Sequence, residues 1–110
     1  MANSDIAMIV DKSGLNLARE DRAYIEAYTT GYDDLYAVVK EYDPVSAAKV
    51  CGIDEDTIRN VARVYAKASK AMSVWTMGIN QSTHGSDGVC AINNLNLITG
   101  NIGTPGGTSL

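Results

Sequence analysis

Apolar residues recur at helical spacing through most of the first seventy positions. The clearest case is the stretch 54–69, in which Asp54 can cap the helix and Ile53 stands where a hydrophobic staple is usual. Basic residues lie on the opposite side, which is typical of a helix that packs on one face and meets water on the other. The residues of the apolar stripe are Ile58, Val61, Ala62 and Tyr65.

Three more helices are predicted before this one from their start and stop signals. Asp21 can cap a short helix carrying Tyr24, Ile25 and Tyr28. Thr30 and Asp33 have nearly the spacing of a capping box, ahead of a helix whose stripe is Tyr32, Leu35, Tyr36 and Val39. Asp43 and Pro44 read as a cap followed by a first-turn proline, and Gly52 can close that helix.

The pattern changes after position 70. Residues 71–77, AMSVWTM, form a short run that is apolar on both faces, as in a strand buried between helices. A loop follows, and then a helix that Ser86 or Asp87 caps and Gly100 ends, with an apolar stripe of Val89, Ile92, Leu95 and Ile98. Asn93, Asn94 and Asn96 are expected to point away from that stripe. The glycine-rich tail is predicted to be a loop.

One strand cannot form a sheet, so a partner must exist. Either residues 7–10 pair with 71–77, or the chain is part of a larger α/β domain, and we favour the second interpretation. The predicted fold is a predominantly helical α/β fragment with about five helices, one strand and a Rossmann-like parent. We expect one partial domain over 1–110, helical over 1–70 and strand-loop-helix over 71–110.

Charge and cysteine content exclude several classes of function. The net charge is −4, with 13 acidic and 9 basic residues, and no cluster of Lys or Arg indicates nucleic-acid binding. No apolar run approaches the ~20 residues that cross a bilayer. The N-terminus lacks the positive charge of a secretion signal. Cys51 and Cys90 have neither disulfide nor zinc spacing, so we expect both to be small buried apolar residues.

Three segments together resemble a known family. They are YTTGYDDLYAVVKEYDPVSAAKVCGIDEDTIRNVARVYAKA, then WTMGINQ, then NLNLITGNIGTPGG. In that order they resemble an internal segment of the large subunits of molybdopterin-dependent oxidoreductases, the family of formate dehydrogenases and nitrate reductases. The resemblance extends from about Tyr24 to the C-terminus. Many relatives place a histidine where this chain has Ser82, so His84 is interpreted as a loop residue.

The resemblance implies that the loop from Met77 to Gln81 lies beside the cofactor. Cofactor-binding residues are therefore predicted at Met77, Gly78 and Gln81, with no catalytic residue and no metal ligand in this chain. The residues agree, because ligands of α/β sheets bind beyond the carboxyl ends of strands. Gly78 allows close approach, the Met77 thioether can lie against a flat ring, and the Gln81 amide can donate and accept hydrogen bonds.

The family also implies a cofactor and partners. We expect a bis-molybdopterin guanine dinucleotide with Mo or W in the parent enzyme, an iron–sulfur cluster elsewhere in it, and none bound to an excised fragment, which alone should be inactive. Expected partners are the remainder of the large subunit, electron-transfer subunits and a small-molecule substrate, without nucleic acid or membrane insertion. The best assignment is a cytoplasmic formate dehydrogenase. The alternatives are a nitrate reductase, a periplasmic parent, and a non-enzymatic helical interaction module.

Overall fold

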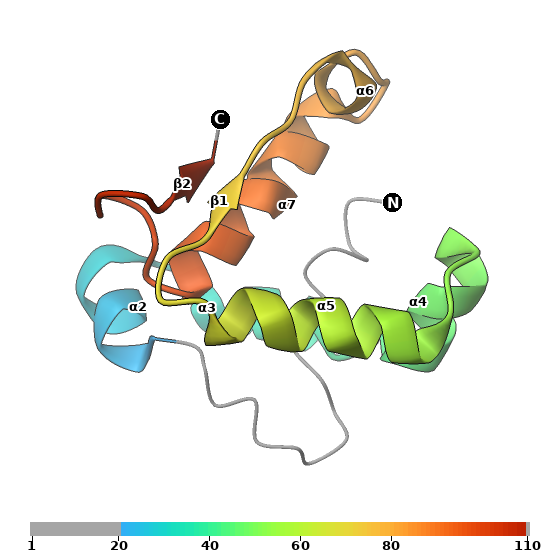
Figure 1. Cartoon of the computed structure of the whole chain (residues 1–110), viewed down its shortest axis with the longest axis horizontal. Coiled ribbons are helices and arrows are strands. Elements are labelled where there is room, and N and C mark those ends of the chain that lie inside the picture. Colours follow the sequence, from blue (N-terminus) through green and yellow to red (C-terminus); the bar gives the residue numbers. More distant parts are fainter. Residues whose placement is uncertain (1–20, 110) are drawn as a thin grey trace.

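Helices dominate the computed structural model of this protein, which describes residues 21–109. Residues 7–10, the alternative partner of the predicted strand, lie outside this range. Within that range the chain forms six helices and two short strands (Figure 1). They are α2 (Arg22–Tyr28), α3 (Tyr32–Val39), α4 (Pro44–Cys51), α5 (Glu55–Lys67), β1 (Met72–Ser73), α6 (Met77–Asn80), α7 (Gly85–Ile98) and β2 (Thr108–Ser109). The prediction of a mainly helical fragment is confirmed, although α6 and β2 were not predicted.

Aspartate caps start three of the helices, as predicted. The carboxylates of Asp21, Asp43 and Asp54 accept hydrogen bonds from the third residue of their helices, at 2.9, 2.7 and 3.2 Å respectively. Each bond satisfies one of the N–H groups that a helix start leaves without a partner. Gly52 ends α4 in the left-handed conformation, with φ of 67°.

Two other predicted helix starts are wrong. Gly31, with φ of 80°, is the N-cap of α3 and makes no side-chain capping bond, so Thr30 does not cap this helix. Helix α7 begins after His84 instead of at Ser86 or Asp87. The backbone N–H of Gly88 already donates to the His84 carbonyl at 2.9 Å, which extends the helix back beyond both predicted caps.

A small core joins α2 to the C-terminal end of α7. Ile25 and Ile98 are buried, and Tyr32, Tyr65 and Leu95 pack around them. The backbone N–H of the residue before α2 also donates to the Ile98 carbonyl at 2.8 Å. One end of α7 is therefore fixed against the helical part of the chain.

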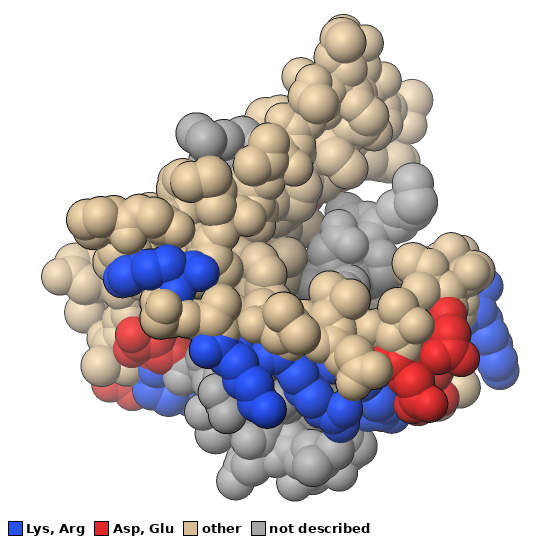
Figure 2. Space-filling model, viewed as in Figure 1, with Lys and Arg blue, Asp and Glu red and all other residues tan. Residues whose placement is uncertain are grey.

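Helix α5 has the two faces that the sequence predicts. Ile58 and Ala62 are 3% and 2% exposed, and α4 packs against this helix. Figure 2 shows basic side chains in a row along α5, with acidic side chains near its start. Arg59 donates to Glu55 at 2.6 Å, one turn earlier. The apolar stripe is nevertheless narrower than predicted, because Val61 is 48% exposed.

The strand is shorter than predicted and has a different partner. Only Met72 and Ser73 pair, in parallel, with Thr108 and Ser109 of the glycine-rich tail, which is therefore not all loop. The predicted burial of both faces is also wrong, since Met72 and Val74 are 49% and 75% exposed. Among the described residues α7 covers one face of β1, and no second layer covers the other.

Helix α6 and the start of α7 project away from the rest of the molecule (Figure 1). The visible face of this projection carries no charged side chain (Figure 2). The sequence gives the reason, because Asp87 is the one Asp, Glu, Lys or Arg between positions 71 and 110. None of the helices between residues 21 and 109 has the length and apolarity needed to cross a bilayer.

Candidate functional site

The three predicted cofactor residues lie on one turn at the tip of this projection. Met77 is the first residue of α6, Gly78 is the second, and Gln81 caps its C-terminus. The backbone N–H of Gln81 donates to the Met77 carbonyl at 3.1 Å, which closes the turn. Met77 is 63% exposed, and Gly78 and Gln81 are exposed as well. We call residues 77–81 the tip turn.

The tip turn is helical, which corrects the prediction that Met77 ends a strand. Thr76 is the N-cap of the helix, and its carbonyl accepts from the N–H groups of Ile79 and Asn80 at 2.9 and 3.2 Å. Among the described residues the ladder between β1 and β2 ends at Ser73 and Ser109, before this point. Residues 74–76 therefore connect a short strand to a single helical turn.

Two glycines of α7 allow the tip turn to pack closely against this helix. A Cβ on Gly85 would lie 2.3 Å from the Asn80 carbonyl oxygen, and one on Gly88 would lie 3.1 Å from the Ile79 Cγ2. The first distance is impossible for real atoms, so only glycine fits at position 85. Sequence reasoning missed this contact, although the spacing of the two glycines in HGSDG was a signal for it.

Gly78 differs from these two glycines. Its φ is not positive, and a Cβ added to it would have no neighbour within 4 Å. The backbone therefore does not require a glycine at position 78 in order to turn. Glycine in a helix costs about 1 kcal/mol relative to alanine. No contact among the described residues accounts for this cost.

A closed group of polar side chains joins β1 to α5 and α7. Tyr65 Oη lies 3.0 Å from Ser73 Oγ and 3.0 Å from Asn96 Oδ1, and Asn96 Nδ2 lies 3.2 Å from Ser73 Oγ. Asn96 is fully buried, which overturns the prediction that it points away from the apolar stripe. Burial raises the pKa of the Tyr65 phenol, and the hydrogen bond with Ser73 partly offsets this. We call these three residues the polar ring.

Asn101 holds the other end of β1. Its Oδ1 accepts from the backbone N–H of Ala71 at 3.0 Å, and its Nδ2 donates to Thr99 Oγ1 at 2.7 Å. A Cβ on Gly107 would lie 2.8 Å from the same Oδ1, so the tail passes directly over this side chain. Sequence reasoning missed both buried asparagines, because an amide in a helix or a loop usually faces water.

Trp75 lies between the polar ring and the tip turn. Its side chain is partly buried, and its Nε1 is buried without a hydrogen-bond partner among the described residues. A buried donor without an acceptor costs roughly 1–3 kcal/mol. Val74 and Thr76, on either side of it, are exposed, so the chain here alternates between an inward and an outward face.

The remaining candidate groups do not form a second site. His84 is exposed, and its Nδ1 lies 3.7 Å from Asp87 Oδ2. Cys90 is exposed and Cys51 partly buried, which corrects the prediction that both are buried. Within residues 21–109 no group of three or more His, Cys, Asp or Glu side chains is placed to hold a metal ion.

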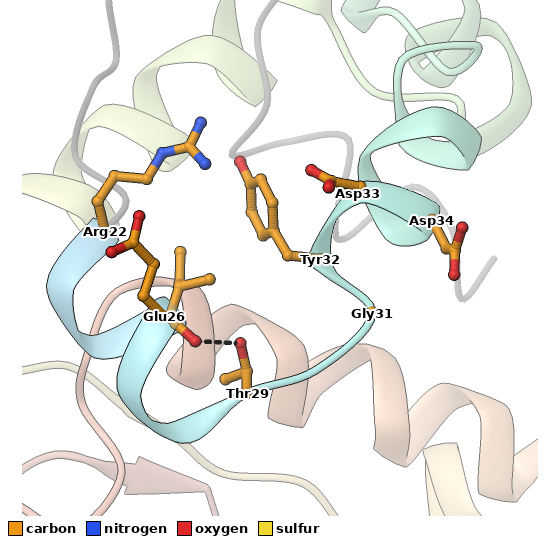
Figure 3. Close-up of a pocket in the computed structure, with 8 residues that line it drawn as sticks. Arg22, Glu26, Thr29, Gly31, Tyr32, Asp33 and Asp34 are labelled. Atoms are coloured by element: carbon orange, nitrogen blue, oxygen red, sulfur yellow. Dashed lines mark hydrogen bonds between the residues drawn. The ribbon is translucent and has the colours of Figure 1, made fainter.

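A hollow of about 470 Å³ lies between α2 and α3 (Figure 3). The Arg22 guanidinium lies 4.6 Å from the centre of the Tyr32 ring, and Thr29 donates to the Ile25 carbonyl at 2.7 Å. Helix α2 contacts the C-terminal end of α7, whereas α6 contacts its start. None of the predicted cofactor residues lines this hollow.

Comparison with known proteins identifies the family. The family model for molybdopterin oxidoreductase matches residues 16–110, which is most of the chain. This chain belongs to the molybdopterin oxidoreductase family. The recognition of this family from the three sequence segments is confirmed, and membership implies that the whole enzyme uses a molybdopterin cofactor.

Relatives of this chain include proteins named formate dehydrogenase and nitrate reductase. The chain is 42% identical to the F420-dependent formate dehydrogenase subunit alpha of Methanocaldococcus jannaschii, over 78% of this chain and 13% of that protein. It is 34% identical to formate dehydrogenase H of Escherichia coli, over 77% of this chain and 12% of that protein. It is 36% identical to the nitrate reductase of a Synechocystis species, over 78% of this chain and 12% of that protein. The chain thus spans about an eighth of the length of these relatives.

Proposed function

We propose that this chain is a segment of the large subunit of a formate dehydrogenase, in which the tip turn contacts the molybdopterin cofactor. Gly78 is the observation that carries the proposal. A glycine stands in a helical turn where the described residues leave open space and alanine would be more stable. Close approach by a group from outside the segment explains why no side chain is present there.

The residues of the tip turn fit a flat, uncharged ring system. Met77 offers an exposed apolar side chain, Gly78 leaves the backbone accessible, and the exposed Gln81 amide can donate and accept at the edge of a heterocycle. No Lys or Arg lies between positions 71 and 110 to pair with a phosphate. This composition favours contact with the pterin part of the cofactor over its phosphates.

The chemistry belongs to the whole enzyme. The cofactor, when bound, supplies the two-electron redox chemistry by which formate becomes carbon dioxide. In this proposal the tip turn binds and orients one side of the cofactor and keeps water away from it. The bis-guanine-dinucleotide form with Mo or W, the metal ligand and the iron–sulfur cluster remain proposals for the other parts of the enzyme.

The names of the relatives support formate as the substrate class. Formate dehydrogenases include the 42% identical protein, and two of the three relatives described are of this kind. Nitrate reduction is the second candidate, because the Synechocystis relative is nearly as similar over the same extent. Assays of the whole enzyme with formate and with nitrate, each with an artificial electron carrier, separate the two. Turnover of neither substrate would contradict both.

Partners and location are proposals of the same kind. The Methanocaldococcus relative is named as an alpha subunit, which supports further electron-transfer subunits around this enzyme. We propose a cytoplasmic enzyme, with a periplasmic one as the alternative, since another relative is named periplasmic nitrate reductase. The family match favours an enzymatic parent over a non-enzymatic helical module, because it covers nearly all of the chain.

Gly78→Ala tests the contact with the cofactor. In the 110-residue chain this change should raise stability by about 0.4–1 kcal/mol, because the new Cβ meets no neighbour and the helix gains. In the whole enzyme it should lower the molybdopterin content per mole of purified protein, because the Cβ occupies the space of the ring. A stabilised chain together with full cofactor content would contradict the proposal.

Gln81→Ala tests the amide in the same enzyme. We expect a loss of cofactor of the size that one missing hydrogen bond produces, ~1–3 kcal/mol, with the melting temperature of the chain unchanged. Asn60→Ala is the matched control, since Asn60 is an exposed amide on α5, away from the tip turn. Equal cofactor content in both variants would show that Gln81 does not contact the cofactor.

A further inference from the structure

The directions of the hydrogen bonds in the polar ring follow from its geometry. Asn96 Nδ2 lies 3.3 Å from the Ile92 carbonyl oxygen, which only accepts, so the amide nitrogen must be on that side. The opposite oxygen, Asn96 Oδ1, therefore accepts from the Tyr65 hydroxyl at 3.0 Å. The orientation of the amide is fixed by the helix that carries it.

The remaining two bonds are then determined. Tyr65 has one hydroxyl proton and gives it to Asn96, so Ser73 must donate to Tyr65 across 3.0 Å. Ser73 Oγ in turn accepts from Asn96 Nδ2 at 3.2 Å. Each member donates once and accepts once within the ring, and bonds arranged in this way polarise one another. Loss of one member takes a hydrogen-bond partner from each of the other two.

The polar ring makes the last side-chain hydrogen bonds of the chain before the tip turn. Ser73 ends β1, and among the described residues no side-chain hydrogen bond holds positions 74–76. Asn96 belongs to α7, whose first residues hold α6 through the close contact at Gly85. The ring thus fixes where the chain leaves β1 relative to the helix on which the tip turn rests.

We propose that Tyr65, Ser73 and Asn96 are positioning residues for the cofactor-facing tip turn. The inference rests on the proposed function, since it assigns a role toward the cofactor that the tip turn contacts. A ring that served stability alone would change the melting temperature when broken and nothing else. A positioning ring also changes the path of residues 74–76 and the fit of the cofactor.

The first experiment uses Trp75, the single tryptophan of the chain, which lies two residues beyond Ser73. Tyr65→Phe and Ser73→Ala each remove one hydroxyl. In the 110-residue chain both should shift the tryptophan emission to longer wavelength and increase its quenching by acrylamide. The double variant should do no more than the stronger single variant, because both changes open the same ring.

Asp54→Ala is the matched control for stability. It removes the capping bond of α5 to Thr57, at the opposite end of the helix from Tyr65. This variant should melt at a lower temperature and keep the wild-type emission of Trp75. Unchanged emission in the ring variants, or an equal shift in Asp54→Ala, would overturn the inference.

The second experiment measures molybdopterin content and steady-state kinetics in the whole enzyme. The ring variants should lose cofactor or kcat/KM by roughly tenfold, as changes behind a binding site typically do. Asp54→Ala should retain both. If the wild-type enzyme carries no molybdopterin, the proposed function is wrong and this inference is wrong with it. If the wild type carries the cofactor and the ring variants keep it with full kcat/KM, this inference alone is wrong.

Discussion

Replacement of Gly85 by alanine should be among the most damaging single-methyl changes in this chain. The new Cβ would lie 2.3 Å from the Asn80 carbonyl oxygen and 2.8 Å from the Asn80 carbonyl carbon. Both neighbours are backbone atoms, so no rotation of a side chain can relieve the contact. Helix α6 would have to move by about 1 Å to reach ordinary van der Waals distance.

The cost can be placed within limits. Overpacking of a well-packed contact costs ~1–3 kcal/mol, and alanine returns up to ~1 kcal/mol because it is the better helix former. Because the neighbours are backbone atoms, the overpacking cost should lie at the upper end of its range, and we expect a net loss of about 2 kcal/mol. At roughly 4–8 °C per kcal/mol for a domain of this size, the melting temperature should fall by about 10 °C.

Thermal unfolding of the 110-residue chain, followed by far-ultraviolet circular dichroism, measures this loss. Gly78→Ala is the matched control, since it adds the same methyl group to the neighbouring helix, where the Cβ has no neighbour within 4 Å. The two variants should move the melting temperature in opposite directions. If Gly85→Ala melts with the wild type, then α6 does not pack on α7 as described, and the position of the tip turn is wrong.

Three further predictions follow from the same contacts. Burial raises the folded-state pKa of Tyr65 above its ordinary value of 10.0, so the neutral phenol stabilises the folded chain fully below pH 10, and this stabilisation is lost as pH rises through the folded-state pKa. Urea titrations should therefore show that Tyr65→Phe loses less stability than the wild type between pH 9 and about pH 11. Asp43→Ala should cost ~1 kcal/mol in urea unfolding, because the Ser46 N–H loses its acceptor, and no change would contradict the cap. Iodoacetamide should alkylate the exposed Cys90 of the folded chain before the partly buried Cys51, as peptide mapping can show.

Sequence signals were reliable where a structure depends on a few neighbouring residues. Asp21, Asp43 and Asp54 each cap the helix that was predicted to follow. A cap needs one side-chain oxygen and one backbone N–H two or three residues later, and both are present in the local sequence. The same holds for Gly52, whose left-handed conformation ends α4. Thr30 failed because Gly31 took the capping position with a positive φ.

Sequence motifs also located the tip turn, but they did not give its shape. WTMGINQ pointed to Met77, Gly78 and Gln81 through a family resemblance, and these residues do lie together on one exposed turn. The helical form of that turn was not predicted. The turn also packs closely on Gly85 through Asn80, and such a contact is decided by how two elements meet in space.

Only the tertiary structure decided which residues pair and which polar groups are buried. Met72 pairs with Thr108, which is far along the sequence. The local sequence of a two-residue strand cannot indicate so distant a partner. Asn96 shows the same limit, because its amide is buried among Tyr65 and Ser73 from two other elements. The sequence determined the local starts and ends of helices, since their energy comes from neighbours. The sheet and the polar ring come from contacts between segments that are far apart in the sequence, and the packing of the tip turn comes from the way α6 meets α7. These contacts form only once the chain has folded.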